Sequence, residues 1–143
     1  MKLLIFTMLL SLLAFNMKAS SSYVIYLEGD IGICKEEYTG KVIKKGKDHG
    51  ALISYCLDLL NEQKGGKMTL AAGTYKIDRP LFIGKNIHVD GDGNATKLIF
   101  SGTKKVESAL IIKEADGVKI TNVSILNKDG NVDTGIIVDN SGS

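Results

Sequence analysis

The chain has 143 residues, with 18 Lys or Arg against 16 Asp or Glu. This length allows one domain, and 44% hydrophobic with 24% charged residues is a globular composition, which excludes a largely disordered chain. Lys2 and Lys18 precede every acidic residue, so residues 20–143 carry 18 − 2 = 16 basic and 16 acidic side chains. A chain without net charge has no electrostatic basis for binding nucleic acid or an anionic membrane, and neither partner is expected.

Residues 1–19 have the pattern of a secretory signal peptide. Lys2 supplies the positive charge, Leu3 to Phe15 is apolar apart from Thr7 and Ser11, and small residues follow. A bilayer span needs about 20 apolar residues, so a membrane anchor is the weaker alternative. We expect cleavage after Ala19 or Ser21 and a secreted protein, extracellular or periplasmic, that is not attached to a membrane.

The chain contains two cysteines, Cys34 and Cys56. In an oxidising compartment a lone pair of cysteines is more often bridged than free, so we predict a disulfide between them. The alternative is two separate buried thiols. Two cysteines without a neighbouring histidine pair do not indicate a metal site.

Residues 20–66 are predicted to form a strand, a loop and one helix. Tyr23 to Leu27 is a strand by its β-branched and aromatic content, and residues 28–47 read as irregular with a possible short strand at 41–43. Asp48 is the predicted N-cap of a helix of about 15 residues that ends at Gly65-Gly66. Its apolar stripe recurs at spacings of three and four: Leu52, Ile53, Cys56, Leu57 and Leu60.

Residues 67–143 contain nine short apolar segments separated by Gly, Asn, Asp and Lys. They begin at Met68, Tyr75, Leu81, Ile87, Leu98, Leu110, Val118, Val123 and Ile136. In several the middle residue is polar, so two side chains would point inward and one outward. Segments this short form a core when three make one triangular coil and successive coils stack in parallel. We therefore predict a mainly β fold, a parallel β-helix of about three coils whose first coil is capped by the preceding helix. An antiparallel sandwich or barrel is the alternative.

The residues around the first coil resemble a known family. Gly65-Gly66-Lys67-Met68-Thr69-Leu70-Ala71-Ala72-Gly73-Thr74-Tyr75-Lys76-Ile77 is similar to the entry of the right-handed parallel β-helix in the pectate lyase and polygalacturonase superfamily. The later stretches 86–93, 117–125 and 135–141 resemble regular coils of the same fold. The resemblance implies a right-handed β-helix protein that acts on cell-wall or acidic polysaccharide as a glycoside hydrolase or polysaccharide lyase. It implies a calcium ion only in the lyase case.

By coil arithmetic a further coil would start near position 144, so we expect the chain to be the N-terminal part of a longer protein. The alternative is a small secreted protein that covers its open end by dimerising. The catalytic residues are unknown, because in the resembled enzymes they lie on central coils. The segment itself is expected to be inactive. A non-catalytic adhesin or carbohydrate-binding β-helix is the alternative function.

Few side chains suggest chemistry. Asp90 and Asp92 would share a face of a strand and could bridge calcium, although aspartates in a glycine turn that bond their own backbone are the preferred interpretation. Asn122 and Asn140 are candidates for hydrogen bonds between stacked turns. Four further carboxylates lie in turn sequence with no pair specified: Asp116, Asp129, Asp133 and Asp139.

The remaining candidates are two histidines, three tyrosines and two glycosylation sequences. His88 is predicted to be an outward surface residue that could contact a sugar, and His49 a surface residue at the helix start. Asn94 and Asn122 fit the N-glycosylation pattern, which applies only in a eukaryotic secretory pathway. The tyrosines are too scattered to predict a sugar-stacking platform: Tyr38, Tyr55 and Tyr75.

Overall fold

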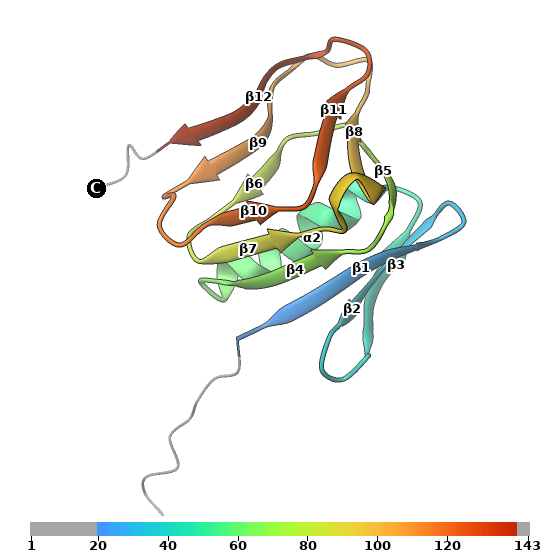
Figure 1. The fold of residues 1–143 in the computed structure, drawn as a ribbon, viewed down its shortest axis with the longest axis vertical. Helices are drawn as coiled ribbons and strands as arrows, with labels where there is room; N and C mark the ends of the chain where they lie inside the picture. Colours follow the sequence, from blue (N-terminus) through green and yellow to red (C-terminus); the bar gives the residue numbers. More distant parts are fainter. Residues whose placement is uncertain (1–19, 140–143) are drawn as a thin grey trace, which may run out of the picture.

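The computed structural model describes residues 20–139, which form twelve strands, one α-helix and one 3₁₀ turn (Figure 1). The predicted signal peptide and Asn140 lie outside these residues. The elements in chain order are β1 (Ser22–Glu28), β2 (Ile31–Glu36), β3 (Val42–Gly46), α2 (His49–Glu62), β4 (Gly66–Leu70), β5 (Gly73–Ile77), β6 (Leu81–Ile83), β7 (Ile87–Asp90), η2 (Gly93–Ala95), β8 (Thr96–Phe100), β9 (Val106–Lys113), β10 (Lys119–Thr121), β11 (Ser124–Asn127) and β12 (Val132–Asp139).

The segment before the helix is more regular than its sequence predicts. β1, β2 and β3 form an antiparallel meander, in which Glu28 pairs with Ile31 across the two-residue turn Gly29-Asp30. Gly29 has a φ of +63°, a conformation that glycine adopts without strain. The prediction of an irregular region at 28–47 is therefore wrong for β2, and the strand predicted at 41–43 is found as β3.

The helix forms as predicted. Asp48 is its N-cap and accepts a hydrogen bond from the Ala51 N–H at 2.8 Å. The predicted apolar stripe is buried: Leu52, Ile53, Cys56, Leu57 and Leu60. The chain leaves the helix through Gly65, whose φ is +138° and where a Cβ would lie 2.8 Å from the Cβ of Asn86. This close approach explains why glycine stands there.

All nine predicted apolar segments are strands, and they form three successive triplets. The first triplet is β4, β5 and β6, the second β7, β8 and β9, and the third β10, β11 and β12. Each strand pairs in parallel with its counterpart in the next triplet, giving the sheet orders β10-β7-β4-β1-β2-β3, β11-β8-β5 and β12-β9-β6 (Figure 1). Consecutive strands of residues 66–139 thus belong to different sheets. The fold is mainly β with parallel pairing, and no antiparallel sandwich is formed by these residues.

Inward side chains stack in register to form the core. Tyr75 pairs with Leu98, and Leu98 with Ile125, while Leu81 and Leu110 make the corresponding column in the third sheet. The first two triplets bury these residues almost completely. In the third triplet Ile136 and Val138, which continue the columns of Leu110 and Ile112, are 46% and 53% exposed.

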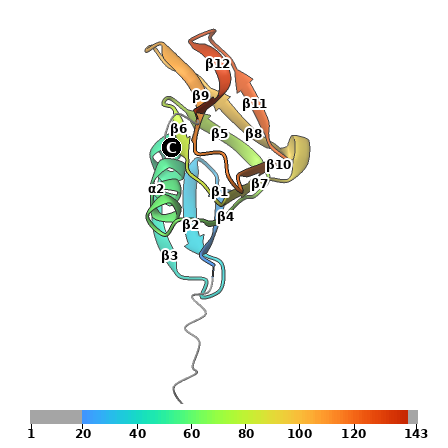
Figure 2. The same ribbon diagram turned by 90° about the vertical axis from the view of Figure 1, so that its left-hand side faces the viewer.

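The two ends of the stack differ. Figure 2 shows α2 on one side and the third triplet on the other. The helix packs on the first triplet, and the Asn61 side chain bonds both the Phe82 carbonyl (3.3 Å) and the Gly84 N–H (2.8 Å). The predicted disulfide between Cys34 and Cys56 is present and joins β2 to α2. The helix thus covers the first triplet, as predicted. Within residues 20–139 no helix has the length and apolarity needed to cross a bilayer.

Candidate functional site

Polar side chains gather on the outer face of β4, β7 and β10, which lie side by side (Figure 1). Side chains alternate along each strand, so the residues between the buried Met68, Ile87 and Val89 point outward. The parallel register places them in two rows across the three strands. The first row is Lys67, His88 and Lys119, and the second is Thr69, Asp90 and Thr121. We call these two rows the sheet A face.

Asp90 is the most connected side chain of the sheet A face. Its Oδ1 accepts hydrogen bonds from the Thr121 hydroxyl (2.8 Å) and from the Asn122 amide (3.0 Å), and its Oδ2 lies 3.5 Å from the Lys67 ammonium. The bonds from Asn122 and Thr121, with Lys67 adding to them, lower the pKa of Asp90 below its ordinary value. The carboxylate is therefore held charged and in a fixed orientation.

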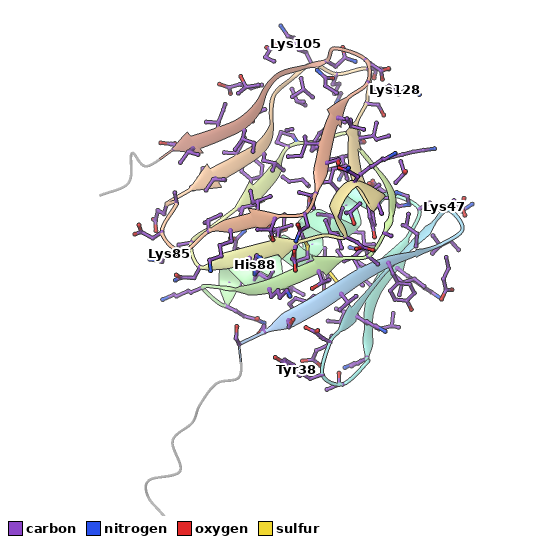
Figure 3. All side chains as sticks on the ribbon, viewed as in Figure 1. Tyr38, Lys47, Lys85, His88, Lys105 and Lys128 are labelled. Carbon is purple, nitrogen blue, oxygen red and sulfur yellow. A yellow bond between two sulfur atoms is a disulfide. The ribbon has the colours of Figure 1, made fainter. Side chains whose placement is uncertain are left out.

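His88 is joined to this network through Thr121. Its Nε2 lies 2.9 Å from the Thr121 Oγ1. Thr121 gives its single hydroxyl proton to Asp90, so its oxygen accepts from the His88 Nε2–H. The imidazole is half-buried on β7 (Figure 3), on the outer face where it is predicted.

The carboxylates do not form the calcium pair considered from the sequence. β7 ends at Asp90, and Asp92 lies beyond Gly91 as the residue before η2, so the two do not lie on one strand. Asp90 also bonds the next triplet rather than its own backbone, which corrects the preferred turn interpretation. In the stretch 20–139 no three His, Cys, Asp or Glu side chains converge to hold a metal ion. Residues 20–139 therefore offer no such carboxylate cluster for a calcium ion.

Within residues 20–139 the other sequence-predicted carboxylates form no pair with one another, and two of them, Asp133 and Asp139, lie on a strand rather than in the turns expected from the sequence. Asp133 on β12 pairs with Lys105 at 3.0 Å, and Asp139 ends the same strand. The Asp116 carbonyl accepts from the Asn86 N–H at 2.8 Å, and Asp129 lies in the turn after β11. The three tyrosines are equally dispersed: Tyr38 is 74% exposed, Tyr55 lies on α2 and Tyr75 is buried.

His49 is not a surface residue, which corrects the prediction. Only 5% of it is exposed, because the first turn of α2 packs against β5. Its Nε2–H donates to the Asp30 carbonyl (3.0 Å), its Nδ1 accepts from the Lys76 N–H (3.2 Å), and its ring meets Tyr75 edge-on at 6.0 Å. Both ring nitrogens are used in holding the β1–β2 turn to the first triplet, so His49 is structural.

The two glycosylation candidates lie in turns. Asn94 is exposed in η2, and Asn122 is exposed in the turn between β10 and β11 with a φ of +58°. The Asn122 amide also makes the predicted hydrogen bond between stacked turns, with Asp90 as the acceptor. Asn140, proposed for the same role, lies outside the described residues.

The sequence analysis does not single out three residues of the sheet A face, namely Lys67, Lys119 and Thr121. If the apolar segments that begin at Met68 and Ile87 are aligned by their ends, Thr69 stands beside His88, since each is the middle residue of its segment. The register instead pairs Met68 with Val89, which moves Lys67 beside His88 and Thr69 beside Asp90. Lys119 could have been found, because it is the middle residue of its own segment and pairs with His88.

Comparisons with protein-family models, curated proteins and solved structures found nothing that matches this chain.

Proposed function

We propose that the protein is a secreted right-handed parallel β-helix protein that binds or processes acidic or cell-wall polysaccharide through the sheet A face. The handedness is supported by the general rule that connections between parallel strands are right-handed in about 98% of cases. The disulfide between Cys34 and Cys56 supports an oxidising, extracellular location. Activity as a hydrolase or lyase rests on the resemblance of the sequence to the pectate lyase superfamily.

The observation that carries the proposal is the in-register row Lys67, His88 and Lys119 beside Asp90. Adjacent strands are about 4.8 Å apart, so the row presents hydrogen-bonding groups at regular intervals along the stack. A polymer with repeated carboxylates and hydroxyls offers groups at similarly regular intervals. Lysine ammonium groups pair with the carboxylates, while the fixed Asp90 carboxylate accepts from hydroxyls.

A binding role is the second candidate, and Asp90 favours it for this part of the chain. Glycoside hydrolysis uses two carboxyl groups about 5–10 Å apart, one of which donates a proton. Asp90 is the one carboxylate in the rows of the sheet A face, and its lowered pKa makes it a poor proton donor at neutral pH. We therefore expect the 143-residue chain to bind without cleaving.

The test uses polygalacturonate and alginate, with dextran as the uncharged polymer. Calorimetry on the signal-free chain should detect binding of the two acidic polymers that weakens as salt is raised. Replacing Lys67 and Lys119 together by Ser should weaken binding about fivefold, since each exposed pairing contributes about 0.5 kcal/mol.

The control variant is Lys47→Ser, because Lys47 pairs with Asp30 on the β1–β3 meander, away from the sheet A face (Figure 3). The proposal would be rejected if both variants lost the same affinity for the acidic polymers, or if dextran bound as tightly as those polymers. An assay for unsaturated products and new reducing ends should remain blank, and depolymerisation by the 143-residue chain would contradict the binding role.

A further inference from the structure

A second candidate site lies at a different corner of the stack from the sheet A face. It is a cavity of ≈570 Å³ between the loop that joins β5 to β6 and the loop that joins β8 to β9. A cavity of this size is within the usual range of small-ligand sites. The lining includes Asp78, Arg79, Pro80, Lys104, Lys105 and Val106. We call it the corner pocket.

Arg79 is oriented at the edge of the corner pocket by two carboxylates. Its Nε donates to Asp78 Oδ1 and its Nη2 to Asp48 Oδ2, each at 2.7 Å. The hydrogen bond from Arg79 lowers the pKa of Asp78, and the charge of Lys104 acts in the same direction. A guanidinium has five N–H groups, so these two bonds leave others to donate to a ligand.

The two lysines of the pocket are placed differently. Lys105 forms an ion pair with Asp133 at 3.0 Å. Lys104 is exposed, and its charge lowers the pKa of Asp78 from a distance. Within residues 20–139 it forms no ion pair shorter than 4.0 Å. Its ammonium group is therefore the cation most readily engaged by an incoming anion. Pro80 and Val106 supply an apolar surface beside it.

We propose that the corner pocket binds one acidic sugar residue, with the sugar carboxylate at Lys104 and the remaining N–H groups of Arg79. The ring would lie on Pro80 and Val106, and its hydroxyls would donate to Asp78. This inference rests on the proposed function, because it takes the ligand to be a unit of an acidic polysaccharide. The charge of Asp78 opposes a second negative charge, so a monoanionic carboxylate is favoured over phosphate or sulfate.

The experiment follows amide chemical shifts of the full chain during titration with trigalacturonate, its neutral methyl ester, inorganic phosphate and sulfate. Trigalacturonate should shift the amide signals of Asp78, Arg79 and residues 102–106. Lys104→Glu should weaken that binding about tenfold, a change of 1.4 kcal/mol. The methyl ester and the two inorganic anions should bind more weakly than trigalacturonate.

The matched control is Lys128→Glu, which makes the same charge change in the turn after β11 at the same end of the molecule (Figure 3) without lining the pocket. The inference would be overturned if Lys104→Glu and Lys128→Glu bound trigalacturonate with equal affinity. It would also be overturned if phosphate bound as tightly as trigalacturonate and its binding depended on Lys104. If the Lys67 and Lys119 variant loses polymer binding while Lys104→Glu does not alter trigalacturonate binding, the pocket fails and the proposed function stands. If no acidic sugar binds anywhere, both fail.

Discussion

Asp90 shows how one side chain can join structure to a candidate function. It accepts from Thr121 and Asn122 of the third triplet and lies near Lys67 of the first, so it connects all three triplets across the sheet A face. The same contacts that orient the carboxylate also couple its charge to folding, because they favour the ionised form in the native state.

This coupling predicts a pH-dependent effect of Asp90→Asn. A carboxylate whose pKa is lowered on folding stabilises the protein above its ordinary pKa of 3.8, and this contribution is lost as pH falls through the lower folded value. The variant should therefore be less stable than the parent in urea at pH 7, and the difference should shrink as the pH is lowered below 3.8. Asp58→Asn on α2 is the control. A stability difference between the variant and the parent that does not change with pH would contradict the role of the hydrogen bonds around Asp90.

At the residue scale, sequence patterns predicted local roles well and distant contacts poorly. Asp48 was predicted as the N-cap because its role depends on its own helix. His49, one residue later, was placed on the surface because its partners, Asp30 and Lys76, are distant in sequence. The sequence predicts that Asn122 bonds a neighbouring turn but does not identify Asp90 as the acceptor, since Thr121 and Asn122 follow Asp90 by more than 30 residues.

At the scale of elements, α2 and the β1–β3 meander form a cover that the disulfide ties together. Cys34 and Cys56 are both fully buried and lie 22 residues apart in the chain. A crosslink that closes a loop of this length stabilises a protein by about 3 kcal/mol, chiefly by restricting the unfolded chain. Without the disulfide, the packing of α2 and the meander on the first triplet should be less stable.

We predict that replacing both cysteines by Ser lowers the free energy of unfolding by about 3 kcal/mol, measured by urea denaturation. The reduced parent protein should show a similar loss, which serves as the control because it changes no side-chain volume. An oxidised parent no more stable than its reduced form would show that the crosslink does not stabilise the cover.

The elements were predictable where hydrophobic spacing is the main signal. The helix and the nine short strands were found because their apolar positions follow clear periods. β2 was missed because Gly29-Asp30 was not recognised as a hairpin turn and the strand ends in the charged Lys35-Glu36. The register between triplets was not predictable, since the spacing of paired residues varies from 21 between Lys67 and His88 to 31 between His88 and Lys119.

At the scale of the whole molecule, the two ends of the stack present different surfaces. The first triplet is covered by α2, whereas the third triplet exposes Ile136 and Val138 on columns that are buried in the second triplet. β10, β11 and β12 are also the outermost strands of their sheets within residues 20–139. Exposed apolar groups beside open strand edges favour association with another chain.

We predict that the 143-residue chain self-associates through this end. Light scattering after size exclusion should show a molar mass that rises with concentration, and Ile136→Lys with Val138→Lys should return it to that of a monomer. Tyr38→Lys is the control, because Tyr38 is 74% exposed on the opposite end of the molecule (Figure 3). A parent chain that stays monomeric throughout, or an equal effect of Tyr38→Lys, would reject the prediction.

The position of α2 also limits how far such assembly can proceed. Head-to-tail growth would have to join the third-triplet end of one chain to the first-triplet end of the next, where α2 packs on β5 and β6, β1 already pairs with β4, and the outer strand β3 carries Lys44 and Lys45. We expect the helix to disfavour growth of residues 20–139 into a fibril of stacked parallel strands.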